Sequence, residues 1–116
     1  MTSSAHQQDE WYQQLPTLSR QAYAEQAFEM AYHTLAAAMY RAKDLGDVSL
    51  LRELLQEVER QKKQLDSTYP AHSLSSSSAH TRGHESVYTG LQRQISTQIQ
   101  FYETQGMLQE LKKHHE

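Results

Sequence analysis

Histidine is the residue type with which this chain could most readily do chemistry, because the sequence contains seven of them. His80 and His84 stand four residues apart, a spacing that would put two imidazoles on one face of a helix, where they could bind a metal ion. Glu85 is the only carboxylate beside them, and the pair lies at the edge of a serine-rich stretch. A metal site needs more ligands and supporting groups than these, so we predict no metal and no other cofactor.

His33 is the one histidine inside a strongly patterned segment, with Glu29 one helical turn before it. A histidine and a carboxylate so spaced could serve as a general base. The sequence offers no serine in a strand-to-helix turn, no glycine-rich phosphate loop and no cysteine to act with them. We therefore predict no catalytic residues and a protein that is not an enzyme. The alternative function is a ligand- or metal-binding helical bundle that uses His33 or the pair His80 and His84.

Aromatic residues are the stronger functional signal, since seven tyrosines and one tryptophan are present. Tyrosine and tryptophan combine apolar area with a polar end and are enriched where protein surfaces meet. Tyr23 and Tyr40 lie off the main apolar row of their segment, which makes them candidates for an interface. Trp11 and Tyr12 form an isolated apolar cluster with Leu15, which could dock on a partner. Of the two possibilities, we favour folding back onto the chain's own bundle.

The elements that must position these side chains are long helices. The composition is low in glycine and proline and rich in alanine, leucine, glutamine, glutamate and lysine, which is typical of helices. Because proline is disfavoured inside a helix and Thr17 can cap one, Pro16 predicts a polar N-terminal arm over residues 1–16. A single helical domain over residues 17–113 is then expected, and its first helix should run over 18–45.

Gly46 and Asp47 give the clearest local signal in the chain. Gly46 can close one helix in the left-handed conformation and Asp47 can cap the next, which predicts a tight antiparallel hairpin. The second helix is expected over residues 47–66, where leucine and valine follow helical spacing. Residues 67–83 are polar and serine-rich, which predicts a flexible linker.

A third helix is expected over residues 85–105, with Val87, Leu91, Ile95 and Ile99 on one face. Phe101, Leu108 and Leu111 are rotated away from this face, and Gly106 stands where the change occurs. The simplest interpretation is a kink or break at Gly106, followed by a short continuation over 107–113. The fold class is therefore all-α: a helical hairpin plus a third long helix, as a three-helix bundle or a dimeric helical bundle.

The net charge of −3 creates no field suited to a phosphate backbone, so nucleic acid is not an expected partner. No segment approaches the roughly 18 apolar residues of a membrane span, and the N-terminus has neither a basic start nor an apolar stretch. From the sequence we expect a cytoplasmic protein without membrane contact.

The predicted first helix is apolar or small over more of its circumference than one pair of neighbours can cover. We therefore predict a homodimer that pairs through a row of small residues flanked by tyrosines. The expected function is a small protein–protein interaction module or assembly adaptor whose partner is unknown. The predicted partner-binding residues are Trp11, Tyr23, Ala27, Ala31, Ala38 and Tyr40.

Overall fold

The computed structural model describes residues 9–115 of the chain, and this part is all-helical, as the sequence predicts. No strand occurs among these residues. The helices are α1 (Glu10–Ala24), α2 (Phe28–Leu45), α3 (Val48–Thr68), α4 (Ser76–Thr81) and α5 (Val87–His115).

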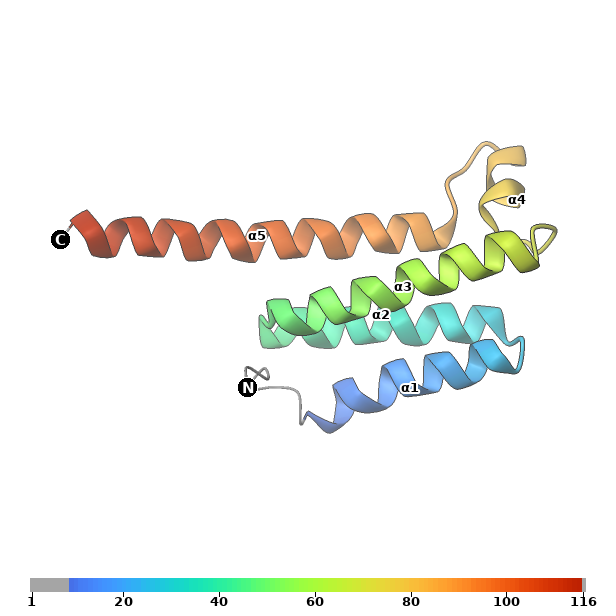
Figure 1. The fold of residues 1–116 in the computed structure, drawn as a ribbon, viewed down its shortest axis with the longest axis horizontal. Helices are drawn as coiled ribbons and strands as arrows, with labels where there is room; N and C mark the ends of the chain where they lie inside the picture. Colours follow the sequence, from blue (N-terminus) through green and yellow to red (C-terminus); the bar gives the residue numbers. More distant parts are fainter. Residues whose placement is uncertain (1–8, 116) are drawn as a thin grey trace.

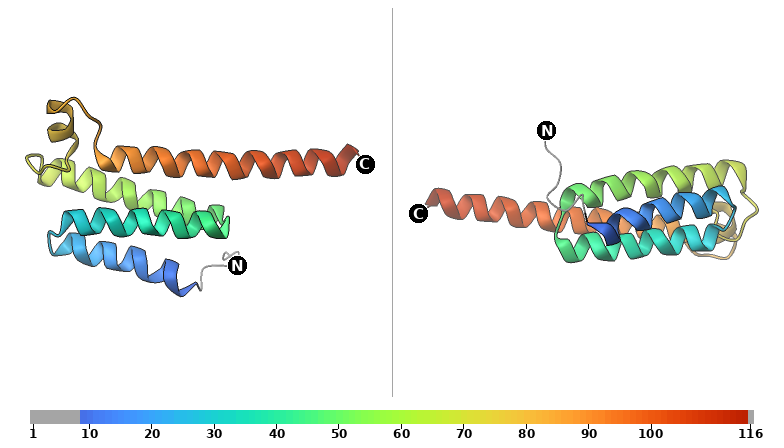
Figure 2. Two further views of the ribbon diagram at one scale, coloured as in Figure 1. Left: turned by 180° about the vertical axis from the view of Figure 1, so that it is seen from behind. Right: turned by 90° about the horizontal axis from the view of Figure 1, so that it is seen from below.

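The helices α2 and α3 form the centre of a four-helix arrangement, with α1 and α5 on opposite sides of this pair (Figures 1 and 2). The short helix α4 sits at one end of the bundle, and α5 runs far beyond the other end (Figure 1). The molecule is accordingly elongated, with extents of 57 × 32 × 21 Å. In the part of the chain that the structure describes, no helix combines the length and the apolar character needed to cross a membrane.

The turn between α2 and α3 has the geometry predicted for Gly46 and Asp47. Gly46 has φ 63° and its N–H donates to the Lys43 carbonyl over 3.0 Å, while the N–H of Asp47 donates to the Ala42 carbonyl over 3.2 Å. A carboxylate oxygen of Asp47 then accepts the N–H of Leu50 at 3.2 Å. The two residues Gly46 and Asp47 therefore satisfy backbone groups of both helices and fix an antiparallel pair.

Replacing Asp47 with alanine should lower the free energy of unfolding by about 1 kcal/mol, because the first turn of α3 loses its N-cap acceptor. Urea denaturation followed by circular dichroism measures this difference. Asp44→Ala is the matched control, since Asp44 is exposed in the last turn of α2, where loss of a negative charge should not destabilise the helix. Equal stability of Asp47→Ala and the unmodified chain would contradict the cap.

The predicted N-terminal arm over residues 1–16 is wrong for Glu10 onward, because α1 begins there and continues through Pro16. Residues 1–8 lie outside the described part of the chain. A proline inside a helix costs about 3 kcal/mol relative to alanine, a cost that tertiary contacts must offset. The Pro16 ring is itself buried, and the hydroxyl of Thr17 donates to the Gln13 carbonyl at 3.1 Å.

The N-terminal half of α1 is held to the bundle by two contacts that the sequence did not reveal. Asp9 caps α1 by accepting the N–H of Tyr12 at 2.8 Å, and it pairs with the guanidinium of Arg41 in α2 at 2.7 and 3.1 Å. The hydroxyl of Tyr12 donates to the Leu50 carbonyl in α3 at 2.9 Å. These contacts explain why the helix starts before Pro16.

The single helix predicted over residues 18–45 is divided between α1 and α2. Gln26 has φ 63°, the left-handed region, and the N–H of Ala27 donates to the Ala22 carbonyl at 2.8 Å. This hydrogen bond ends α1. Gln26 thus takes the left-handed position at the end of the helix that glycine usually occupies. No glycine or proline marks the break, so the sequence pattern continued across it.

The predicted linker over residues 67–83 contains the helix α4. Ser75 caps it by accepting the N–H of Ser78 at 3.1 Å, and Asp66 in α3 accepts both the N–H and the hydroxyl of Ser76, at 2.8 and 2.6 Å. The serines supply these hydrogen bonds, and the segment also packs apolar side chains, since Ala79 is buried and Tyr69 and Leu74 contact the core. This connection is therefore structured.

The break predicted at Gly106 is also wrong, because α5 is one continuous helix of 29 residues. A single glycine in a helix costs only about 1 kcal/mol relative to alanine, which the flanking helix formers can offset. The apolar side chains do change face along this helix, but the backbone continues through the change without a break.

Candidate functional site

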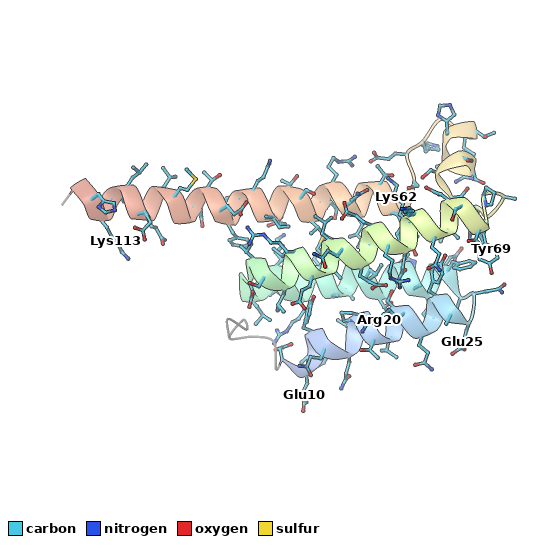
Figure 3. The ribbon with its side chains drawn as sticks, viewed as in Figure 1. Glu10, Arg20, Glu25, Lys62, Tyr69 and Lys113 are labelled. Atoms are coloured by element: carbon cyan, nitrogen blue, oxygen red, sulfur yellow. The ribbon has the colours of Figure 1, made fainter. Side chains whose placement is uncertain are left out.

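The last part of α5 leaves the bundle. The hydroxyl of Tyr102 donates to the carbonyl of Lys43 at the end of α2, over 2.9 Å, and Glu103 forms an ion pair with Arg52 of α3. Beyond these two contacts, residues 104–115, here called the α5 extension, continue as regular helix for about 18 Å. Figure 3 shows Lys113 on this projecting segment, with no other described helix beside it.

The α5 extension exposes large apolar side chains. The exposed fractions are 67% for Met107, 54% for Leu108 and 53% for Leu111, and Phe101 at the root of the extension is 52% exposed. These four residues are called the α5 stripe. Every residue of the extension up to His114 is exposed, so no other helix among residues 9–115 covers this apolar surface.

The α5 stripe faces away from the bundle. The residues of α5 that pack against α2 and α3 include Leu91, Ile95 and Ile99, which are almost fully buried. Leu111 lies about 160° around an ideal helix from Ile95, so the stripe occupies the opposite side of α5. One helix thus has two apolar faces: the first packs against the bundle, and the second is exposed to solvent.

A second surface feature is the groove between α1 and α3, which has a volume of about 690 Å³. Its charged residues pair with one another, since Glu57 is 3.7 Å from Arg20 and forms a closer ion pair with Arg60. Tyr12 contributes to its lining, and burial, with Glu53 and Asp47 nearby, raises the pKa of this phenol. Arg20, Glu57 and Arg60 thus neutralise one another along the groove, and its tyrosine stays protonated, which leaves few charges there to recognise a ligand.

A buried polar network links four helices near this groove. Gln61 of α3 is fully buried; its amide N–H₂ donates to the hydroxyl of Ser19 in α1, and its amide oxygen accepts the hydroxyl of Tyr88 in α5, both at 2.9 Å. Ser19 in turn donates to the carbonyl of Ala31 in α2 at 2.7 Å. Burial raises the pKa of Tyr88, which keeps its hydroxyl protonated as a donor. This network fixes how the helices align.

The predicted partner-binding residues do not form one surface. Ala31 and Ala38 have an exposed fraction of 0%, since the bundle itself covers this face of α2. Ala27 lies exposed in the turn before α2, and Tyr40 is 58% exposed beside α5. Ala31 and Ala38, which the sequence assigned to a dimer interface, are therefore buried inside the bundle itself.

Trp11 and Tyr23, the two aromatic candidates in α1, differ in how far they are buried. Trp11 is 72% exposed, while its neighbour Tyr12 is buried, so only part of the predicted cluster folds back onto the bundle. Tyr23 is half-buried, with its ring 5.0 Å from that of Phe28, and its hydroxyl has no hydrogen-bond partner among the described residues. Tyr23 is therefore a packing residue, while Trp11 remains open to solvent.

The histidine candidates are separated. His33 is exposed on α2, with its ring 5.1 Å from that of Tyr32. His80 lies in α4, whereas His84 follows the end of that helix, and its N–H donates to the Ala79 carbonyl at 2.9 Å. The pair therefore does not share a helical face. Within residues 9–115 no three histidine or carboxylate side chains gather as metal ligands.

The sequence did contain the signal for the α5 stripe. The spacing of Phe101, Leu108 and Leu111 is helical, and its rotation from the bundle face was noted. From the sequence alone, a kink or break at Gly106 is the simplest interpretation of this rotation. The structure assigns both faces to one straight helix.

Comparison of the chain with models of known protein families, with curated proteins and with solved structures finds no match in any of the three. The function is therefore inferred from geometry.

Proposed function

We propose that this chain is a non-enzymatic helical interaction module, an assembly adaptor that presents the α5 stripe to a protein partner. One observation carries the proposal: α5 continues for residues 104–115 beyond its last bundle contacts and displays apolar side chains that nothing in the described chain covers. A helix segment of this length is only marginally stable in water, and it gains most from packing its apolar face. A partner supplies that packing.

The bundle supports this role by anchoring the extension rigidly. The extension continues a helix whose first half is buried against α2 and α3, and Tyr102 and Glu103 tie its root to both of them. The partner therefore meets a helix that is already formed at one end, which lowers the entropy cost of binding. No observation in the structure favours a ligand or metal site at His33, His80 or His84 over this role.

A photo-crosslinking amino acid placed at Leu111 should capture a protein when the chain is expressed in its native cell, because Leu111 lies on the α5 stripe. The same amino acid at Gln109 is the matched control, since Gln109 is also exposed on the extension but lies about 160° from Leu111 on the helix. Mass spectrometry of the adducts measures the result. We expect a defined adduct from Leu111, its loss when Leu108→Glu is added, and little adduct from Gln109.

Equal adducts from the two positions, or none from either, would contradict the proposal. An adduct that persists in the Leu108→Glu chain would show contact without recognition by the stripe, and would count against it as well.

A further inference from the structure

We infer that the occupant of the α5 stripe is the same stripe of a second copy of this chain, paired antiparallel. The inference rests on the proposed function, since it names the partner of that surface. It differs from the dimer expected from the sequence, whose interface on α2 is buried within the chain.

The stripe is complementary to itself when the two helices run in opposite directions. Phe101, Thr104, Leu108 and Leu111 follow steps of three and four residues, the spacing of the core positions of a two-helix coiled coil. An antiparallel pair centred near Gly106 places Phe101 opposite Leu111 of the second copy. It also places Thr104 opposite Leu108 of the second copy. Each layer then combines a large residue with a smaller one, which fills the interface evenly.

Charge favours the same direction. The extension ends with Lys112 and Lys113, so a parallel pair would bring like charges of the two copies together. In the antiparallel pair Lys112 lies instead beside Gln98 and Gln100 of the second copy, which are neutral hydrogen-bond partners. The antiparallel arrangement thus keeps Lys112 and Lys113 of one copy away from the same two residues of the other copy.

The surface continues onto the bundle. An extension that runs antiparallel along α5 of the second copy passes Thr97 there, beside a groove between α2 and α5 of about 270 Å³. That groove is also lined by Tyr40 and Lys43, and Tyr40 is 58% exposed. Because the stripe faces away from its own bundle, the two bundles lie on the outer sides of the pair and do not collide. The exposed tyrosine gives the incoming helix an aromatic contact.

The exposed apolar area suits a dimer of moderate affinity. Each of the four stripe residues leaves half or more of its surface exposed, which is on the order of 100 Å² per side chain. Two copies together offer about 800 Å² of apolar area, roughly half of a standard interface of about 1,600 Å² before polar flanks are counted. Self-association should therefore be visible at micromolar concentrations and depend on concentration.

Sedimentation equilibrium of the full chain tests the pairing directly. At tens of micromolar we expect the mass of two chains, and the variant with Leu108→Glu and Leu111→Glu should give the mass of one. Its melting temperature should stay within a few degrees of the unmodified chain, because both side chains are more than half exposed in the single chain. The control variant Gln109→Glu, whose substituted residue lies off the stripe, should remain a dimer.

Disulfide formation tests the direction, which is straightforward because the chain has no cysteine of its own. Thr104→Cys and Leu108→Cys chains, mixed and oxidised, should give mainly the mixed disulfide, since antiparallel pairing puts these positions opposite each other. A disulfide requires the two Cα atoms to lie within about 7 Å. A strong disulfide between two Leu108→Cys chains would indicate parallel pairing and overturn the inference.

The two proposals fail in distinguishable ways. A mass of one chain up to hundreds of micromolar, or a dimer that the two glutamates leave intact, would overturn the second copy as the occupant. If the photo-crosslinker at Leu111 then captures a different protein, the proposed interaction module stands. If it captures nothing, the proposed function falls as well.

Discussion

Gln61→Ala is expected to lower the free energy of unfolding by about 3 kcal/mol, one of the two largest effects of a single substitution in this chain. The change leaves a cavity at a fully buried site and removes the acceptor of the Tyr88 hydroxyl and the donor to Ser19. A buried polar group left without its partner costs about 1–3 kcal/mol, and the cavity adds to that cost. Chemical denaturation followed by circular dichroism measures the loss.

A control at an exposed glutamine and a double-mutant cycle separate the effect of the hydrogen bonds from that of the cavity. Gln56→Ala, an exposed position on the same helix, should change the stability by less than about 0.5 kcal/mol. Gln61→Leu fills most of the volume but still strands the Tyr88 hydroxyl, so adding Tyr88→Phe to it should restore part of the stability. Strict additivity of Gln61→Leu and Tyr88→Phe would show that the network does not couple α3 to α5.

Ala31→Glu is expected to abolish the folded bundle. Ala31 has no exposed surface, and its carbonyl accepts the Ser19 hydroxyl at the contact between α1 and α2. A carboxylate at this position would either be buried without a cation or overpack the contact between α1 and α2. Separating the helices costs less free energy than either arrangement, so the bundle should come apart. We expect loss of the cooperative thermal transition and of most helical circular dichroism at neutral pH.

The matched control is Ala37→Glu, because Ala37 is exposed on the same helix. It should keep both the helical signal and the cooperative transition, with a change in stability of less than about 0.5 kcal/mol. If Ala31→Glu instead kept its helix content and only halved the mass in sedimentation equilibrium, then Ala31 would lie at an interface between copies, as the sequence alone suggested.

The elements with strong local signals could be predicted from the sequence. The hairpin at Gly46 and Asp47 was recognisable because one residue tolerates the left-handed conformation and the next carries a capping carboxylate. The helix α3 was recognisable because its leucines and valines repeat at helical spacing on one face. In these segments local preference and tertiary packing favour the same structure.

The features that the sequence did not reveal depend on contacts between distant residues. Pro16 is tolerated in α1 because Asp9 reaches Arg41 and Tyr12 reaches Leu50, and no local pattern shows either contact. Gln26 adopts a conformation that glycine usually takes. The buried role of Gln61 was hidden because a glutamine on an amphipathic helix is ordinarily at the surface. Each case is a tertiary override of a residue's ordinary preference.

The exposure of the α5 stripe could not be predicted from the sequence either. The sequence shows that Phe101, Leu108 and Leu111 are rotated away from the other apolar face of their helix, but whether they are covered depends on where the bundle ends along α5. Only the structure shows that α2 ends and α3 begins near the level of Tyr102 and Glu103, so that neither helix continues beside the extension. The predicted interface on α2 failed for a different reason: α1 begins about two turns earlier than predicted, ends at Ala24 and packs against α2 as a separate helix.

The short turns of this bundle also bear on how it forms. The connections between α1 and α2 and between α2 and α3 span only residues 25–27 and 46–47, so these three helices meet through contacts that are close in the chain. Contacts of this kind close small loops and favour rapid folding. The pairing of α3 with α5 closes the longest loop, residues 69–86, and the hydrogen bonds of Asp66 to Ser76 already shorten it. The chain is thus arranged so that its last helix joins a hairpin core that local contacts can assemble first.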